Sequence, residues 1–227
     1  MANVRKFSAM KDIGHLCAHY ARNVQPGHYS NVDIRENLTH NDYNLAPDRG
    51  KQTDYIKQKI AEIQDGRTLR KDAVRMCCWV VDAPAGMTED KKNDFFLAAY
   101  NFLVDRYGTI SGLGEDIVIS AYVHKDESTD HLHFAFLPII DRSGQKSFCA
   151  KEVVGKADLK TFHDDLGNYM EKHHICRAGD IKNGKTIRDS SGRALSVREL
   201  KNRSRIRERT LSSRWTLNDE RSRKWTR

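Results

Sequence analysis

Three histidines close together in the sequence have the spacing of a metal site. His131 and His133 are separated by one residue in an apolar run that predicts a β-strand, so their side chains should share one face. His124 ends the preceding apolar run, and a hairpin would fold it beside the other two. Three neutral imidazoles that leave coordination positions open are typical of a catalytic divalent ion. The sequence therefore predicts that these three histidines hold one ion.

Acidic residues between the histidines support this interpretation. Asp126 or Glu127 lies near enough in sequence to orient a ligating imidazole or to act as a base. The alternative is that the His-x-His pair consists of ordinary surface imidazoles. The helical His-Glu-x-x-His motif of metalloproteases is absent from the sequence, and so is the Pro-Cys-x-x-Cys motif of nucleic-acid deaminases. Both of these metal-dependent activities are therefore disfavoured.

The elements around the histidines predict an α+β domain. Residues 117–123 and 131–140 are apolar runs separated by a polar segment, which indicates an antiparallel hairpin, and residues 73–81 predict a further strand. Apolar residues at helical spacing predict helices, with Thr88 as an N-cap. They cover residues 14–21, 53–64, 88–108 and 158–173. We expect a central antiparallel β-sheet flanked by helices.

Basic residues are concentrated in the C-terminal part of the chain. Residues 181–227 contain fifteen Lys and Arg against five Asp and Glu, whereas residues 1–180 contain 24 against 26. We therefore expect a domain over residues 1–180 and a basic extension over residues 181–227, with a turn at 189–192 and a helix that starts near Ser196. Such a segment attracts polyanions, and Arg203, Arg205 and Arg207 are its expected DNA contacts. Acidic proteins and lipids are the alternative partners.

Composition gives no sign of a membrane or secreted protein. The 227 residues include no apolar run of about eighteen residues and no apolar signal-peptide core at the N-terminus. The five cysteines have no Cys-x-x-Cys spacing, which predicts reduced and packed thiols. These features predict a soluble intracellular protein.

Several segments in this order resemble motifs of one enzyme family. The segment from His124 to His133 is similar to the third motif of MobV-type (Mob/Pre) plasmid mobilization relaxases, which are HUH endonucleases. Earlier segments agree with that family over residues 1–175. They comprise the stretch with His19 and Arg22, Ser30-Asn-Val-Asp-Ile34, Thr39-His-Asn-Asp-Tyr-Asn-Leu45, and Arg70-Lys-Asp-Ala-Val74. The family segment usually has proline before the second histidine, whereas Asp130 stands here.

The resemblance implies an HUH relaxase palm and a cytoplasmic bacterial enzyme that nicks single-stranded or hairpin DNA at an origin of transfer. Its cofactor would be Mn²⁺ or Mg²⁺, which polarises the scissile phosphate. Relaxosome or coupling proteins would be further partners.

The same resemblance assigns roles to individual residues. His19 matches a histidine nucleophile that forms a phosphoramidate with the 5′ end of the DNA, and Glu127 matches its base. Arg22 and Arg70 match basic positions that clamp the phosphate, and Arg70 with Lys71 would contact DNA.

Two other functions stay open at this stage. Tyr43 would serve as the nucleophile if the chain were a replication-initiator-like HUH nuclease that uses tyrosine. A basic nucleic-acid-binding protein with a merely structural metal is the third possibility. Composition and spacing alone do not favour His19 over Tyr20, Tyr43, His28 or His40 as the nucleophile.

Overall fold

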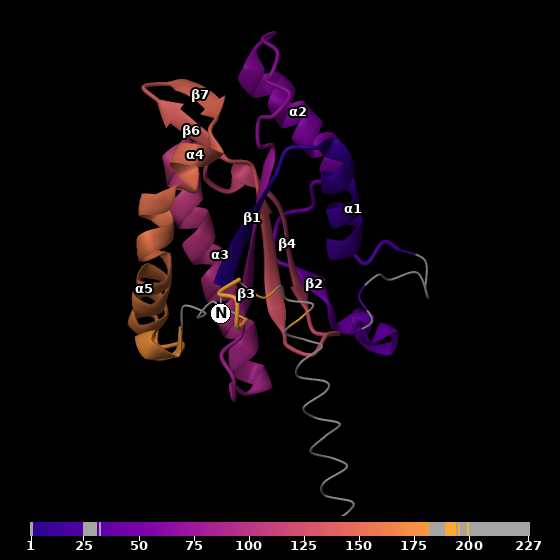
Figure 1. Ribbon diagram of the computed structural model, residues 1–227, viewed down its shortest axis with the longest axis vertical. Helices are drawn as coiled ribbons and strands as arrows, with labels where there is room; N and C mark the ends of the chain where they lie inside the picture. Colours follow the sequence, from indigo (N-terminus) through magenta and orange to yellow (C-terminus); the bar gives the residue numbers. More distant parts are fainter. Residues whose placement is uncertain are drawn as a thin grey trace, which may run out of the picture. The chain divides into compact units, whose positions relative to one another are not determined.

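A five-stranded antiparallel sheet forms the centre of the computed structural model, which describes residues 2–24, 31, 33–181, 189–193, 195 and 199. The chain comprises two compact units, Met1–Asn183 and Gly184–Arg227. The sheet belongs to the first unit, and its strands are arranged in the order β1-β3-β5-β4-β2 (Figure 1). Their bounds are β1 Ala2–Phe7, β2 Tyr43–Asn44, β3 Met76–Asp82, β4 Val118–His124 and β5 His131–Phe136.

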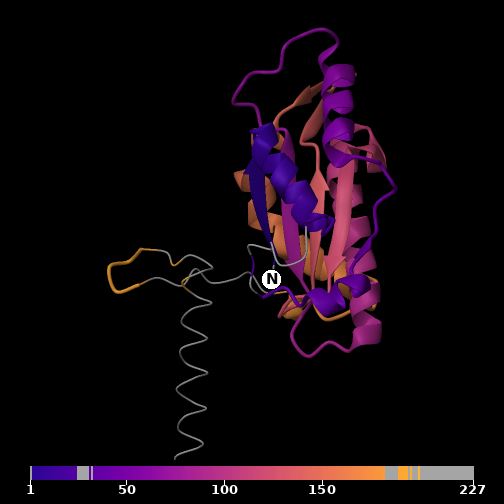
Figure 2. The ribbon, with the colours of Figure 1, turned by 90° about the vertical axis from the view of Figure 1, so that its right-hand side faces the viewer.

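Helices cover both faces of this sheet. Helices α1 (Met10–Tyr20) and α2 (Gln52–Gln64) lie over one face, and α3 (Glu89–Ser111) with α5 (Lys156–Lys172) lies over the other (Figures 1 and 2). Shorter helical segments are η1 Glu36–Asn41, η2 Gly114–Ile117, α4 Ala150–Val153 and η3 Ala178–Asp180. None of the helices in the described residues is long and apolar enough to cross a membrane. The predicted α+β fold with a central antiparallel sheet is confirmed.

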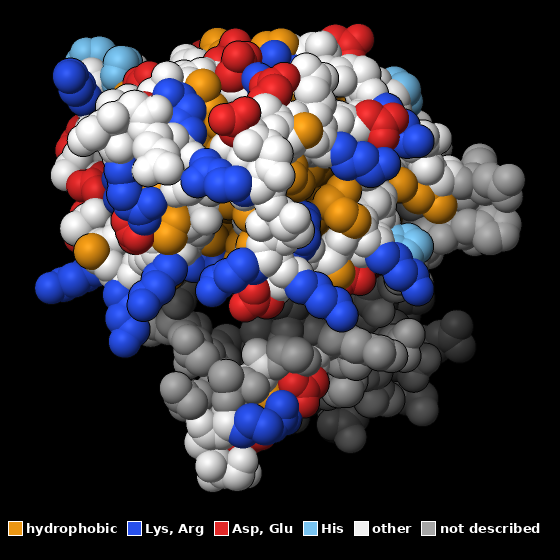
Figure 3. All heavy atoms as spheres, turned by 90° about the horizontal axis from the view of Figure 1, so that it is seen from above, with side chains coloured by type: hydrophobic (Ala, Val, Ile, Leu, Met, Phe, Trp, Pro, Cys, Tyr) orange, Lys and Arg blue, Asp and Glu red, His pale blue; other side chains and the backbone are white. Residues whose placement is uncertain are grey.

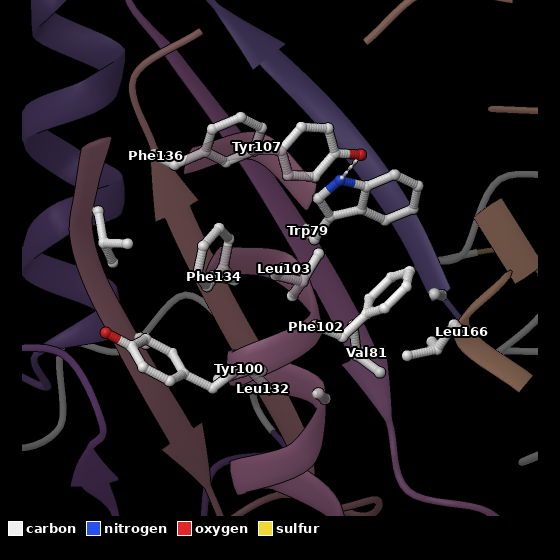
Figure 4. Packing of buried hydrophobic residues seen from close by; sticks show 14 of the residues in the cluster. Trp79, Val81, Tyr100, Phe102, Leu103, Tyr107, Leu132, Phe134, Phe136 and Leu166 are labelled. Carbon is white, nitrogen blue, oxygen red and sulfur yellow. Dashed lines mark hydrogen bonds between the residues drawn. The ribbon is translucent and has the colours of Figure 1, made fainter. Parts of the chain in front are cut away.

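The larger hydrophobic core lies between the sheet and helices α3 and α5. Trp79 from β3 stacks on Phe162 from α5 with ring centroids 3.6 Å apart. The Trp79 indole N–H donates to the Tyr107 hydroxyl at 2.9 Å, so the buried polar atom is satisfied (Figure 4). Phe134 and Phe136 add further buried rings on this face. Because β5 alternates its side chains, His131 and His133 point to the opposite face, toward α1.

Two element predictions need correction. The predicted strand over residues 131–140 ends at Phe136, because Pro138 has no N–H to continue the ladder. The following residues form a separate two-stranded sheet, β6 Ile139–Arg142 with β7 Gln145–Phe148, closed by Ser143 and Gly144 at positive φ. Thr88 stands at the N-cap of α3 as predicted, but its side chain makes no capping hydrogen bond.

Little of the second unit is described. The predicted turn at residues 189–192 is present, with the Asp189 carboxylate accepting the backbone N–H of Ser191 and Arg193 at 3.0 Å each. The predicted helix from Ser196 and the predicted DNA contacts Arg203, Arg205 and Arg207 lie outside the described residues.

The close approach of α3 to the segment after it depends on a glycine. A Cβ atom at Gly108 would come within 2.6 Å of the Gly114 carbonyl oxygen, which is backbone and cannot move aside. Gly108→Ala should therefore lower the free energy of unfolding by about 2 kcal/mol, within the range of overpacked sites. Urea denaturation measures it.

The matched control is Gly14→Ala in α1. The nearest atom to a Cβ there is the Thr53 side chain at 4.0 Å, so alanine should stabilise the helix by about 1 kcal/mol. Equal stabilisation by both substitutions would show that the close approach imposes no constraint.

Candidate active site

The three histidines predicted as metal ligands meet at one end of the sheet. His124, the last residue of β4, pairs directly with His131, the first residue of β5. His133 lies two residues farther along β5 on the same face, and the His131 and His133 Nε2 atoms are 3.0 Å apart. The His124 ring centroid lies 5.3 Å from that of His131 and 4.7 Å from that of His133. All three side chains are buried.

Backbone carbonyls fix which nitrogen of two rings faces the cluster. The Nε2–H of His124 donates to the Tyr20 carbonyl oxygen at 2.9 Å, and the Nδ1–H of His131 donates to the Thr129 carbonyl oxygen at 2.8 Å. The remaining nitrogen of each ring then carries a lone pair. His124 Nδ1 is buried and has no hydrogen-bond partner among the described residues, so it is suited to accept a cation.

The cluster favours neutral imidazoles. Burial lowers the pKa of His124 to about 2, and the nearby Arg22 charge also lowers it. Burial holds the pKa of His133 well below its ordinary value, with His131 as the next cause. A metal ion requires the unprotonated form of its ligands. These imidazoles are therefore in the state that binds a divalent ion at neutral pH.

His19 joins this cluster from α1. Its ring centroid is 5.6 Å from that of His124 and 5.8 Å from that of His133. Burial lowers the pKa of His19, and the Arg22 charge lowers it further, so the ring is neutral. Donor atoms of His19, His124 and His133 all lie within 4.8 Å of one another, as do those of His124, Glu127 and His131. The structure thus brings together four imidazoles and one carboxylate.

Arg22 lies beside the histidines, but its guanidinium already contacts three carboxylates. Arg22 Nε is 2.9 Å from Asp126 Oδ2 and 3.2 Å from Asp42 Oδ2. Arg22 Nη2 donates to Asp126 Oδ1 and, at 3.1 Å, to Glu127 Oε1. The Arg22 side chain is only 7% exposed. The structure therefore places it as the centre of an ion-pair network rather than at an open phosphate site.

Arg70 and Lys71 are not brought to the histidines. They precede β3, whose last residue, Asp82, pairs with His131, so they lie at the other end of that strand. The Arg70 side chain is 83% exposed and pairs with Asp72. The structure therefore separates Arg70 from the histidine cluster, and motif order alone does not reveal the end of the strand at which a motif lies.

The end of the sheet that carries Arg70 has a hollowed surface with apolar and basic side chains. Figure 3 looks onto it and shows hydrophobic side chains in its middle, Lys and Arg side chains gathered along the lower border, and Asp and Glu side chains among them. A hollow of about 350 Å³ lies there, lined by apolar Leu69, Val74 and Phe148 and by basic Arg70 and Lys151.

Tyr43 lies apart from the histidines. It belongs to edge strand β2, packs against the core on the α3 side of the sheet, and donates its hydroxyl to Asn93 Oδ1 at 3.2 Å. Burial raises its pKa, and the charge of Asp130 raises it further. The Asp130 carboxylate accepts a hydrogen bond from Lys92 Nζ at 2.8 Å, so its negative charge is paired with a lysine of α3.

Several residues at the site were not predicted. Asp42 accepts from both Arg22 and the Lys125 backbone N–H, the latter at 2.7 Å. Asn31 donates to Glu127 Oε2 at 2.8 Å, and Arg35 donates to the Glu127 carbonyl oxygen at 2.7 Å. The Tyr20 ring stacks on His133 with centroids 4.5 Å apart. The family resemblance included the segments that contain Asn31 and Asp42 but assigned these two residues no role.

Known proteins resemble this chain over most of its length. A family model described as plasmid recombination enzyme matches residues 1–189. Plasmid recombination enzymes from Streptococcus agalactiae (29% identical over 181 residues) and Mammaliicoccus lentus (30% over 181 residues) each match 76% of this chain. The chain covers only 33% and 40% of their lengths, respectively.

A solved structure is similar as well. The manganese-bound MobM relaxase domain (MOBV) in complex with plasmid pMV158 oriT DNA has a TM-score of 0.71 and 28% identity. The match covers 89% of this chain and 97% of that one.

The buried histidines should make the ion-free protein sensitive to acid. Unfolded His124 gains a proton below its ordinary pKa of 6.5, whereas folded His124 does so only near 2, so stability falls as pH falls below 6.5. Between pH 7 and pH 5, His124 alone should remove about 2 kcal/mol of unfolding free energy. Urea denaturation with a chelator at both pH values measures this loss.

His124→Gln should shrink that loss, because glutamine does not titrate. His40→Gln, which changes an exposed histidine, should retain the full loss. An unchanged loss in His124→Gln would contradict the expected burial of a neutral imidazole.

Proposed function

Because the chain belongs to the plasmid recombination enzyme family, we propose that it nicks one DNA strand at an origin of transfer and stays covalently joined to the 5′ end. The observation that carries this proposal is the convergence of His19 with His124, His131 and His133 beside Glu127. The oriT DNA bound by the similar MobM relaxase domain supports the same class of substrate. Plasmid or mobile-element mobilization would be the biological outcome.

The proposed cofactor is Mn²⁺ or Mg²⁺, held by His124, His131 and His133. His124 Nδ1 accepts no hydrogen bond from the described residues and lies 4.0 Å from Glu127 Oε1, and together with the carbonyl-fixed rings this fits a divalent ion. The manganese in the MobM relaxase domain supports this choice. When bound, such an ion withdraws charge from a phosphate oxygen and so makes the phosphorus easier to attack.

His19 is the proposed nucleophile. A ring nitrogen of the neutral imidazole attacks the scissile phosphorus, so a P–N bond forms and the P–O bond to the 3′ oxygen breaks. The other ring nitrogen gives up its proton to Glu127, whose carboxylate lies in the same cluster. The departing 3′ oxygen takes a proton and becomes a hydroxyl. The histidine then carries the 5′ phosphate as a phosphoramidate.

The tyrosine mechanism receives less support. Tyr43 lies on the α3 side of the sheet, whereas the histidines face α1. Tyr20 stacks on His133, but it is 3% exposed and burial strongly raises the pKa of its hydroxyl. A phenol in that state is a poor nucleophile, because the phenolate is the attacking form.

DNA contacts beyond the nick are also proposed. Arg70 and Lys71 at the far end of the sheet, and Arg203, Arg205 and Arg207 in the extension, supply positive charge for a single-stranded or hairpin substrate. Relaxosome or coupling proteins would join the complex.

The covalent step can be tested without knowing the nick sequence. A 3′-labelled randomised single-stranded library is incubated with protein and Mn²⁺, because the DNA on the 3′ side of the nick stays on the protein, and adducts that survive denaturation are captured and sequenced. The wild-type protein should form adducts that a chelator abolishes. His19→Gln should lower the yield at least about a thousandfold, as expected for loss of a nucleophile.

Tyr43→Phe and the exposed control His40→Gln should both keep forming adducts. The link should be labile in acid, as a P–N bond is, whereas a phosphotyrosine ester survives. Adducts that persist in His19→Gln and vanish in Tyr43→Phe would establish the tyrosine mechanism. Binding without any adduct would leave a non-catalytic nucleic-acid-binding protein.

The end of the sheet that carries Arg70 and Lys71 should contribute to DNA binding rather than to the nicking step. Replacing Arg70 and Lys71 together by Gln should weaken binding of the selected oligonucleotide and lower the slope of log Kd against log salt by about 1 to 2. The nicking rate constant at saturating DNA should stay unchanged. Lys57→Gln, which removes an exposed lysine of α2 paired with Asp54, is the control. An unchanged salt slope in the double variant would place the DNA elsewhere.

A further inference from the structure

We propose that Arg22 and Asp42 act as a positioning pair, which holds Glu127 and the C-terminal end of α1 in fixed positions relative to one another. Arg22 then does not clamp the phosphate of the DNA. This inference rests on the proposed nicking function. It gives a role to Asp42, which the family resemblance did not single out, and it changes the role expected of Arg22.

The backbone at Arg22 is the first observation. Helix α1 ends with the Asn23 N–H donating to the Ala18 carbonyl oxygen at 2.9 Å, and Arg22 has φ +50°. Arg22 directly follows the C-cap residue Ala21, and the left-handed conformation at this position normally favours glycine, because a Cβ is strained there. A residue that costs stability at this position needs compensation, and here its side chain supplies it through the carboxylates.

The network around the guanidinium is the second observation. Asp126 receives a two-pronged contact from Arg22 Nε and Nη2, and Nη2 also reaches Glu127 Oε1 at 3.1 Å. Arg22 Nη1 lies 3.4 Å from His19 Nδ1, one helical turn earlier. One guanidinium therefore contacts both the proposed base and the proposed nucleophile.

Asp42 ties a third segment to this centre. Its carboxylate accepts from Arg22 Nε at 3.2 Å and from the Lys125 backbone N–H at 2.7 Å. Its side chain is 6% exposed. The segment before β2, the turn between β4 and β5, and the end of α1 are thus joined through two side chains.

Charge and burial oppose a phosphate clamp. Three carboxylates surround one guanidinium that is 7% exposed, so a DNA phosphate would meet net negative charge there. Reaching the phosphate would also require Arg22 to leave buried carboxylates unpaired, which is costly.

The two roles predict different kinetics. Single-turnover adduct formation is measured with the oligonucleotide selected from the library, and the rate constant at saturating DNA is separated from the DNA affinity. As a positioning residue, Arg22→Gln should lower the rate constant about 10- to 100-fold and leave affinity within about threefold. Arg22→Lys keeps the positive charge but loses the planar guanidinium that binds carboxylates through two nitrogens. Its rate constant should therefore lie between those of Arg22→Gln and the wild-type protein.

Asp42→Asn discriminates most sharply. For a positioning pair it should lower the rate constant about tenfold, and adding it to Arg22→Gln should cause little further loss, because both act on one network. A phosphate clamp predicts the opposite, since removing a carboxylate would free Arg22 and tighten DNA binding.

Arg22→Gly tests folding separately from positioning. Glycine relieves the backbone strain but leaves Asp126 without its arginine, as Gln does, so Arg22→Gly should be more stable to urea than Arg22→Gln and yet nick as slowly. The matched control is Arg106→Gln. Arg106 in α3 likewise pairs with two carboxylates, those of Asp158 and Asp165 in α5, and its replacement should leave the rate constant unchanged.

The outcomes separate the two proposals. If the wild-type protein forms no adduct, the nicking function fails, and the inference fails with it. If the wild-type protein forms adducts and Arg22→Gln loses DNA affinity without losing rate, Arg22 is a phosphate clamp and the inference alone is wrong.

Discussion

The direct pairing of His124 with His131 across β4 and β5 is the constraint on which the site depends. Side chains alternate along a strand, so a slip of one residue would turn His131 and His133 into the apolar core and bring Leu132 out to α1. The aromatic residues of β5 prevent such a slip, because Phe134 and Phe136 must pack beneath α3. The stability of the core on one face therefore sets the geometry of the chemistry on the other.

Burial then determines how the polar groups of the site are arranged. Imidazoles can be neutral, so His124 and His133 are buried at a cost that hydrogen bonds and loss of charge keep small. A buried carboxylate needs a raised pKa or a cationic partner, and the fully buried Asp126 is paired with Arg22. The cluster is thus divided into a neutral half that suits a cation and a charged half in which three carboxylates bind one guanidinium.

Local patterns predicted the fold and the convergence of the three histidines well. Alternation in β5 and the apolar stripe of α3 are short-range signals, and so is the spacing of the three histidines. The edge strand β1 escaped prediction because an edge strand is only partly buried and its apolar pattern is weak. The partners of Arg22 escaped because Asp126 follows 104 residues later, and only the closed sheet brings them together. Motif order likewise gave no warning that Arg70 lies at the far end of β3.

The length of strand β3 sets the distance between the end of the sheet that carries Arg70 and the end that carries the histidines. Its six residue steps from Met76 to Asp82 span about 20 Å, which separates the basic end of the sheet from the histidines. Paired DNA advances about 3.4 Å per nucleotide along one strand, so about six nucleotides are needed to reach from one end to the other. For the DNA contacts proposed at the two ends, paired DNA of about this length would be the shortest that reaches both, whereas single-stranded DNA extends farther per nucleotide.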